Sequence, residues 1–173
     1  MEQVTLRLAA PDDADAIAAV QVAAWHATYR GMVPDEALDA FTVPARSARW
    51  REILAASPPG ADTRVAVVGG EVRGFASTGP SRDDDAPDGF ELYALYVDPA
   101  HLRRGYGAML LGAALGGVAA RGGRAVTLWV LAANAVARRF YEASGFAADG
   151  AQKRDERLGG AGEVRYRVAL DGG

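Results

Sequence analysis

The chain has 173 residues, which is close to the usual size of one compact domain, so we expect a single domain over residues 1–173. Half of the residues are hydrophobic and 24% are charged, a composition typical of a folded chain and too apolar for disorder. The formal charge of −3 argues against a nucleic-acid partner. Because cysteine is absent and His26 and His101 are the only histidines, we expect no disulfide, no cysteine nucleophile and no metal site.

We do not expect a membrane partner either. The longest apolar-leaning stretch, from Gly105 to Ala120, is shorter than a membrane span and is interrupted by glycines. The N-terminal sequence MEQVTLRLAAPDDAD lacks the basic start and the apolar core of a signal peptide. Together these features predict a cytoplasmic protein.

The first third of the chain predicts one strand followed by helices. Val4–Leu8 alternates apolar and polar residues as a half-buried strand does. A helix is expected to begin near Pro11, with acidic residues at its positive end, and to run to about Tyr29. Pro34 and Pro44 are expected to begin two further short helices.

The middle of the chain predicts a three-stranded antiparallel unit. Arg64–Val68 and Val72–Thr78 read as strands, and Gly69-Gly70 between them supplies the positive φ angles of a two-residue hairpin turn. A loop follows at 79–89, and Phe90–Val97 is expected to form the third strand.

The last third predicts alternating helices and strands: a helix at Gly105–Arg121, a strand at Arg124–Leu131, a helix at 135–144 and short strands near 146–149 and 163–170. The glycine at 145 is expected to end the second of these helices. This order of elements predicts a mixed α/β domain with a largely antiparallel first half.

The segment VDPAHLRRGYGAMLL (97–111) is the most informative part of the sequence. A strand ends, and Gly105-Tyr106-Gly107 opens a helix whose free N–H groups and positive dipole end favour phosphate oxygens. Glycines there allow close approach of a diphosphate to the backbone, and Arg103 and Arg104 add positive charge. A helix that merely begins with small residues is the structural alternative.

Two well-known phosphate cradles do not fit this segment. A Walker loop requires a lysine followed by serine or threonine, and Lys153 is the only lysine. The dinucleotide fingerprint GxGxxG requires glycine at 110, where Leu110 stands, and the acidic residue expected about twenty positions later is missing.

The chain resembles the GNAT superfamily of acyl-CoA-dependent N-acetyltransferases. The first signature of that family, (Arg or Gln)-x-x-Gly-x-(Gly or Ala), matches at Gly105 and Gly107, although Leu102 occupies its first position. The second, in NAVARRFYEASGF, matches at Asn134, Ala137, Phe140, Tyr141, Gly145 and Phe146. The resemblance follows the order of elements over residues 4–170 and is residue-specific from about 91 to 146.

The resemblance implies the GNAT fold, with a mixed central sheet of six to seven strands and helices on both faces. It also implies acetyl-CoA as the acetyl donor. The backbone of residues 103–108 is then expected to bind the diphosphate, and the strand containing Leu95, Tyr96 and Val97 to part from its parallel neighbour so that the thioester enters. The expected coenzyme-binding residues are Leu95, Tyr96, Val97, Arg103, Arg104, Gly105, Tyr106, Gly107, Ala108, Asn134, Ala137 and Tyr141.

Three chemical roles follow for an acetyl transfer by direct attack. The resemblance assigns the acid that protonates the leaving thiolate to Tyr141, an oxyanion donor to the backbone N–H of Val97, and a contact with the pantetheine arm to Asn134. The residues themselves leave structural interpretations open, because Tyr141 is also suited to packing its helix on the sheet and Asn134 to capping that helix.

The amine's proton requires a base, and Glu91 is the candidate because family members often carry a glutamate at the start of this strand. An exposed carboxylate at a strand edge is the alternative. Tyr93 projects from the same strand face and either lines the acceptor pocket or packs there. The acidic residues of the 83–88 loop either attract a cationic amine or are simply solvated.

The acceptor pocket is expected to be walled by the helices after the first strand, where Trp25 and Tyr29 lie four residues apart on one helix face. Core packing is the alternative role for both, and His26 is expected to be structural. The segment from Trp25 to Gly31 resembles one common among bacterial members of the family.

The main hypothesis is therefore an acetyl-CoA-dependent N-acetyltransferase that acts on a primary amine in a ternary complex, with a small molecule favoured as the acceptor. A protein N-terminal or lysine acetyltransferase is one alternative, and a non-catalytic acyl-CoA-binding sensor is another. By analogy with family members that pair through C-terminal strands, a homodimer is also expected.

Overall fold

The computed structural model describes residues 2–86 and 88–171. Its helices and strands follow the predicted order of elements. Along the chain they are β1 (Val4–Leu8), η1 (Pro11–Asp13), α1 (Ala14–Tyr29), α2 (Asp35–Asp39), α3 (Val43–Ala56), β2 (Asp62–Val68), β3 (Glu71–Pro80), β4 (Phe90–Val97), η2 (Pro99–His101), α4 (Tyr106–Ala120), β5 (Ala125–Leu131), α5 (Ala135–Ala143), β6 (Ala147–Asp155), η3 (Glu156–Leu158) and β7 (Ala161–Ala169).

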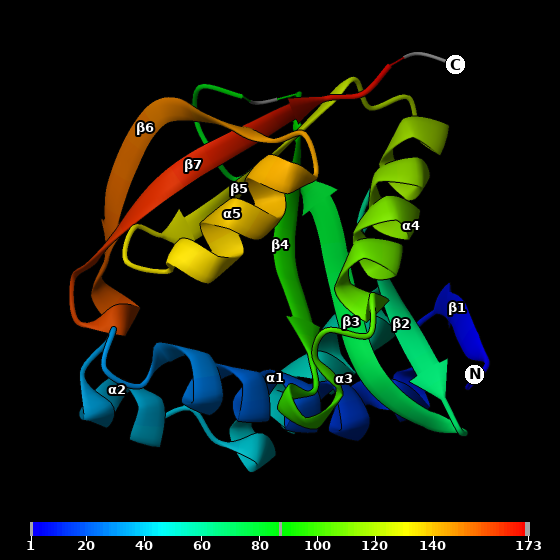
Figure 1. The fold of residues 1–173 in the computed structure, drawn as a ribbon. Coiled ribbons are helices and arrows are strands. Elements are labelled where there is room, and N and C mark those ends of the chain that lie inside the picture. Colours follow the sequence, from blue (N-terminus) through cyan, green and yellow to red (C-terminus); the bar gives the residue numbers. More distant parts are fainter. Residues whose placement is uncertain (1, 87, 172–173) are drawn as a thin grey trace.

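A seven-stranded mixed sheet forms the centre of the molecule, in the order β1-β2-β3-β4-β5-β7-β6 (Figure 1). The neighbours from β1 to β4 are antiparallel, as predicted for the first half of the chain. The β4–β5 pair is parallel, and β7 returns between β5 and β6 with antiparallel pairing on both sides. The parallel pair is possible because α4 provides the crossover connection from β4 to β5.

Helices cover both faces of the sheet (Figure 1). On one face, α1 and α3 pack on β2–β4 through a core that contains Ile17, Trp50 and Phe75. On the other face, α4 and α5 bury residues such as Leu110 and share a core with β5 and β7. The expected arrangement of six to seven strands with helices on both faces is confirmed.

The hairpin between β2 and β3 turns through Gly69 and Gly70, whose φ angles are +59° and +84°. Both central residues of such a turn need a left-handed conformation, which glycine adopts without strain. The glycine pair therefore sets the predicted hairpin.

Three predicted lengths are wrong. The helix at Pro44 is not short, because α3 has 14 residues and buries Trp50 under the sheet. The strands expected near 146–149 and 163–170 are longer, and β6 and β7 have 9 residues each. The sequence of β6, AADGAQKRD, hides the strand because most of its residues are exposed and Gly150 (φ +92°) lies at an irregularity in its pairing.

Among the residues that the structure describes, no helix is both long enough and apolar enough to cross a membrane.

Candidate active site

The strands β4 and β5 pair only at their first residues and then part. Phe90 lies opposite Val126 and Glu91 opposite Thr127, and no further pairs join the two strands. A cavity of about 840 Å³ opens where they separate. Leu95, Tyr96 and Val97 line it from β4, as the resemblance predicted for the coenzyme strand.

A β-bulge at Tyr93 lies beside this opening. On the β3 side, Leu92 pairs with Thr78 and Ala94 with Ser77, so Tyr93 is the extra residue. A bulge bends its strand and increases the local twist, which favours the parting from β5. The Tyr93 hydroxyl donates to the backbone oxygen of Pro80, and the Arg82 guanidinium lies 4.4 Å from the centre of its ring. Tyr93 thus lines the cavity while also anchoring the 81–89 loop.

The backbone amides of β4 point alternately towards β3 and towards the cavity. The N–H of Asp98, directly after the strand, donates to the Arg73 oxygen on the β3 side at 2.8 Å. Because successive N–H groups of an extended chain point in opposite directions, those of Val97 and Leu95 face the parted side. These amides are suited to bind an extended ligand or a developing oxyanion.

The glycine-rich turn leads from β4 into α4. Arg103 and Gly105 both have positive φ angles, +62° and +83°. Met109 donates the first intrahelical bond, to the Gly105 oxygen, so the N–H groups of residues 106–108 have no partner within the helix. These amides and the positive end of α4 border the cavity, which fits the predicted phosphate cradle.

The two arginines before this turn differ. Arg103 lines the cavity. Arg104 instead directs its guanidinium to Glu2, with 3.3 Å between Nη1 and Oε2, and is half-exposed. A contact from the Arg104 side chain to a ligand in the cavity therefore requires that this surface ion pair opens.

Asn134 and Tyr141 reach the cavity from α5. The Asn134 side-chain oxygen accepts from the Ala137 N–H at 3.1 Å, which confirms the predicted cap. Tyr141 packs edge-on against Phe140 and Phe146 and also lines the cavity. Burial, and to a lesser degree the neighbouring Tyr96, raises the pKa of the Tyr141 phenol above its ordinary value of 10. The phenol is therefore protonated at neutral pH and able to act as an acid.

The residues predicted for the acceptor pocket lie at the same cavity. Trp25 stacks on Phe41 with 3.7 Å between ring centres, and the Tyr29 hydroxyl lies 3.1 Å from that of Tyr96. Both residues line the cavity and also pack against a small core beneath α2, so the two interpretations of their role are compatible. His26 faces the Phe41 backbone oxygen at 3.2 Å, which fits a structural role.

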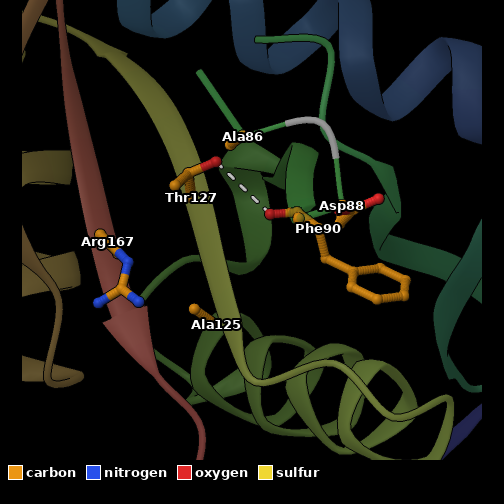
Figure 2. Close-up of a pocket in the computed structure, with 7 residues that line it drawn as sticks. Ala86, Asp88, Phe90, Ala125, Thr127 and Arg167 are labelled. Atoms are coloured by element: carbon orange, nitrogen blue, oxygen red, sulfur yellow. Dashed lines mark hydrogen bonds between the residues drawn. The ribbon is translucent and has the colours of Figure 1, made fainter. Parts of the chain in front are cut away.

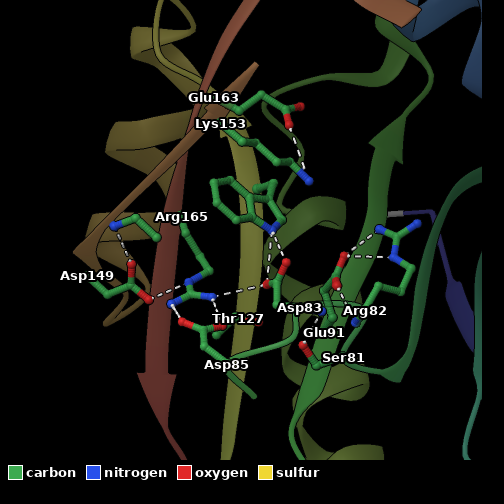
Figure 3. Close-up of polar contacts among 12 residues, drawn as sticks. Ser81, Arg82, Asp83, Asp85, Glu91, Thr127, Asp149, Lys153, Glu163 and Arg165 are labelled. Carbon is green, nitrogen blue, oxygen red and sulfur yellow. Dashed lines mark hydrogen bonds and ion pairs between the residues drawn. The ribbon is translucent and has the colours of Figure 1, made fainter. Parts of the chain in front are cut away.

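Glu91 is buried, not exposed at a strand edge. Its side chain is 2% exposed, and both carboxylate oxygens accept hydrogen bonds from Arg82 (Figure 3). The alternative of a solvated carboxylate is therefore wrong. Glu91 lines the cavity, but Arg82 occupies its oxygens.

The acidic loop at 83–88 is held by a network around Arg165 (Figure 3). The Arg165 guanidinium pairs with Asp85 at 2.7 Å and with Asp83 at 3.2 Å, and Asp83 also accepts from the Trp129 indole at 3.1 Å. The hydrogen bond to Asp85 is the largest cause that raises the pKa of Arg165, and those to Asp149 and Asp83 add to it. Two of the loop's carboxylates are thus structural ion-pair partners.

Sequence reasoning missed a group of charged residues that line the cavity: Arg82, Lys153, Asp155, Arg157 and Glu163. Most of them come from β6, η3 and β7, on the far side of β5 from β4, where η3 lies close to the helices α1 and α2 (Figure 1). For these residues, the sequence offered only the alternation of polar and apolar residues in VRYRVAL. This alternation predicts a strand but not the strand with which it pairs.

A second, smaller cavity of about 280 Å³ lies at the opposite end of the β4–β5 pair (Figure 2). There the strands are joined, and the Thr127 hydroxyl donates to the Phe90 backbone oxygen at 3.5 Å. No residue of the two sequence signatures lines this cavity. The parted end of the strands is therefore the candidate active site.

Comparisons with known proteins identify the family of the chain. The acetyltransferase (GNAT) family model matches residues 22–146. The uncharacterized N-acetyltransferase YuaI of Bacillus subtilis is 30% identical over 131 residues, which are 76% of this chain and 73% of that protein.

Two solved structures share the fold. A GCN5-related N-acetyltransferase from Rhodopseudomonas palustris superposes with a TM-score of 0.76 at 26% identity, over 98% of each chain. The PaiA N-acetyltransferase of Thermoplasma acidophilum, solved in complex with coenzyme A, superposes with a TM-score of 0.81 at 18% identity, over 97% of this chain and 99% of that chain.

The parted strands and the glycine turn, with the fold around them, define an acyltransferase that uses acetyl-CoA as its donor. The chain belongs to the GNAT acetyltransferase family. The family that the two sequence signatures indicated is thereby confirmed.

Proposed function

We propose that this protein transfers the acetyl group of acetyl-CoA to the primary amine of a small molecule, by direct attack in a ternary complex. The observation that carries the proposal is the continuity of the cavity. The same cavity is lined by the turn at Gly105, by the Tyr141 phenol and by Trp25 and Tyr29. A donor bound at one end and an acceptor at the other therefore meet inside it.

The donor end fits a diphosphate followed by an extended amide chain. The free amides of residues 106–108 and the positive end of α4 would hold the diphosphate, with Arg103 beside them. The cavity-facing N–H groups of Leu95 and Val97 would bind the pantetheine arm and the carbonyl oxygen of the thioester. Asn134 and Ala137 border the same path. In other enzymes, a preorganised oxyanion donor lowers the activation free energy by about 2.7–4 kcal/mol.

Two proton transfers accompany the reaction. An amine with a pKa of about 10.4 is protonated at pH 7, and keeping it neutral costs roughly 4.6 kcal/mol, so a base that lowers this cost is useful. The leaving thiolate, with a pKa of about 8.5 by analogy with cysteine, benefits from an acid. Tyr141 is proposed as that acid, because it is buried, protonated and in the cavity.

Glu91 stays a prediction as the base. Its position on β4 at the cavity supports that role. The three hydrogen bonds that it accepts from Arg82 weigh against the role, since they already occupy both of its oxygens.

The shape of the acceptor end supports a compact substrate. Side chains from separate elements enclose it, among them Tyr29 on α1, Met32 after α1 and Leu158 on η3. Charges of both signs also line this end, including Arg157 and Glu163, which favours a polar amine. A protein N-terminus or a lysine side chain is the second candidate acceptor.

The test is the release of free coenzyme A over a panel of amines: amino acids, polyamines, aminoglycosides, and peptides with free N-termini or lysines. Turnover on a small amine with little on the peptides supports the proposal. Preferred turnover on peptides would move the assignment to protein acetylation. Tight acetyl-CoA binding with no turnover on any amine would instead indicate a sensor.

We also propose that the protein acts in the cytoplasm and pairs as a homodimer. Because β7 is paired on both sides, the edge available for pairing at the C-terminal end of the sheet is that of β6. Sedimentation at several protein concentrations would test the dimer.

A further inference from the structure

Two glutamates line the cavity, Glu91 buried and Glu163 partly buried, and Figure 3 shows that their surroundings differ. The oxygens of Glu91 accept from the Arg82 backbone N–H at 3.1 Å, from Nε at 3.2 Å and from Nη2. Both guanidinium nitrogens therefore donate to one oxygen of Glu91, whose side chain is 2% exposed, while the Arg82 side chain is 60% exposed. Losing these bonds would leave a buried carboxylate without partners, so Glu91 is well suited to hold the loop at Arg82.

Glu163 is the opposite case. Its side chain is 12% exposed, and the nearest cation, the Lys153 ammonium, lies 3.7 Å from Oε2, which is longer than an ordinary hydrogen bond. Lys153 is also drawn to the Trp129 ring, 4.3 Å from its centre. The Glu163 carboxylate is therefore partly buried beside a cation that makes no ordinary hydrogen bond to it.

The register of β7 turns Glu163 towards the cavity. Glu163 lies opposite Leu131 of β5 and Lys153 of β6. Tyr166, three residues on, points to the α5 side, where its hydroxyl donates to Glu142 at 2.7 Å. Because side chains alternate between the two faces of a strand, Glu163 points to the other side, towards α1.

Two phenols line the same cavity as this carboxylate. The hydroxyls of Tyr29 and Tyr96 lie 3.1 Å apart. Burial is the largest cause that raises the pKa of each phenol, and the negative charge of Glu163 adds to it. The proposed acid, Tyr141, lines this cavity as well.

We infer that Glu163, rather than Glu91, takes the proton from the acceptor amine. This inference rests on the proposed function. One N–H bond of the ammonium breaks and its proton passes to a Glu163 oxygen. The freed lone pair forms the C–N bond at the thioester carbonyl, the C–S bond breaks with its electrons on sulfur, and the nitrogen gives its second proton to water to leave the neutral amide. The sulfur takes the Tyr141 proton. Exchange with water then returns both residues to their starting states.

The environment of Glu163 favours this role at neutral pH. Burial raises the pKa of the Glu163 carboxyl, and Lys153 partly opposes that effect. A base is most effective when its pKa is not far from the working pH. Activity is expected to fall as the pH drops through this raised value, because the protonated carboxyl cannot accept a proton. The titratable and charged groups that face it are Lys153 and Asp155 on β6, Arg157 on η3, Tyr29 on α1 and Tyr96 on β4.

The experiment compares kcat and kcat/KM against pH for the wild type, Glu163→Gln and Glu91→Gln, with an alkyl amine found in the screen. Glu163→Gln is expected to lower kcat by about 10²–10⁴-fold and to remove the acidic limb of the profile. Glu163→Asp should restore part of the rate. Glu91→Gln should retain the acidic limb. Glu156→Gln, the same change on an exposed residue of η3, is the matched control and should behave as the wild type does.

A second substrate separates chemistry from folding. An aromatic amine is already unprotonated at pH 7 and needs no base before attack. On such a nucleophile, the difference between the wild type and Glu163→Gln should shrink to less than about tenfold, since the proton transfer contributes much less. Stabilisation of the variant by acetyl-CoA in a thermal shift assay should equal that of the wild type.

Three results would overturn the inference while leaving the proposed function intact: Glu163→Gln keeps both its rate and its acidic limb, it loses activity equally on both nucleophiles, or Glu91→Gln abolishes the limb. A wild type that binds acetyl-CoA but acetylates no amine would refute the proposed function itself, and the inference with it.

Discussion

The two ends of the cavity offer different kinds of chemical group to a ligand. At the donor end, the groups offered to a ligand are main-chain amides: those of the turn before α4 and the cavity-facing ones of β4. At the acceptor end, they are side chains that come from α1, β4, β6, η3 and β7. A backbone site depends on the path of the chain and tolerates many side chains, whereas a side-chain site changes with each substitution. The donor end therefore carries the family's shared chemistry, and the acceptor end determines which amine is used.

The largest effect should come from the residue at the junction of the two ends. Tyr141→Phe removes the hydroxyl and keeps the ring that packs between Phe140 and Phe146. Because the leaving thiolate then lacks its acid, we expect kcat to fall by about 10²–10⁴-fold. Acetyl-CoA affinity should change little. Single-turnover kinetics would measure the rate, and calorimetry would measure the affinity. Unchanged turnover would remove Tyr141 as the acid.

Acetyl-CoA binding at the donor end should be weakened most directly by a change in backbone conformation. Gly105 has a φ of +83°, and a Cβ added there meets no atom within 4 Å, so any cost of a substitution comes from strain, not from collision. Gly105→Val should cost on the order of 1–3 kcal/mol in the cradle conformation and weaken acetyl-CoA binding by about 5–150-fold. Equilibrium binding measurements would show this.

Gly112→Ala is the matched control for that prediction. Gly112 lies inside α4 with open space around it and no left-handed φ. Alanine there should stabilise the helix by about 0.5–1 kcal/mol and leave acetyl-CoA binding unchanged. If both variants bound acetyl-CoA as the wild type does, the turn would not be the cradle.

Substitutions of Asn134 test whether a side chain, besides the main-chain amides, contacts acetyl-CoA at the donor end. Its oxygen caps α5, so Asn134→Ala should lower the free energy of unfolding by about 0.5–2 kcal/mol. Asn134→Asp keeps the capping oxygen and removes the amide donor. If the acetyl-CoA affinity of the aspartate variant falls while its stability is retained, Asn134 also contacts the ligand. If the aspartate variant and the wild type bind acetyl-CoA equally well, Asn134 acts only as a cap.

The donor end was predictable from the sequence because its determinants are local. The segment 97–111 carries the strand end, the loop and the helix start within fifteen residues, and the second signature encodes a cap, a helix and its end at Gly145 in the same way. Each of these features follows from the conformational preference of a residue and its near neighbours. Tertiary structure had only to bring two such segments together.

Trp25 and Tyr29 of the acceptor end were predicted, but its charged side chains were not, because their positions depend on pairing register. Glu163 enters the cavity only because β7 returns between β5 and β6 with Leu131 as its partner. A shift by one residue would turn this carboxylate to the α5 face. The partner of Glu91 is likewise Arg82, nine residues earlier in the predicted 79–89 loop, whose conformation no local pattern gives.

The smallest expected effect concerns the stability of the acceptor end. The Asp155 carboxylate is 10% exposed and Arg157 is 82% exposed, with 2.8 Å between Oδ2 and Nη2. Hydrogen bonding from the Arg157 side chain is the largest cause that holds the pKa of Asp155 below its ordinary value of 3.8. This pair therefore stabilises the folded protein above that value, and the contribution is lost as the pH falls through the lowered one.

Arg157→Gln should accordingly reduce the free energy of unfolding by about 0.2–1 kcal/mol at pH 7, and the difference from the wild type should close in acid below about pH 4. Urea denaturation at both pH values would measure it, with Arg139→Gln as the control at an exposed position of α5. A loss well above about 1 kcal/mol would mean that the fold depends on this pair. A small loss would fit the contrast between the two ends, because a side chain that contributes little to folding can be exchanged between relatives to suit a different amine.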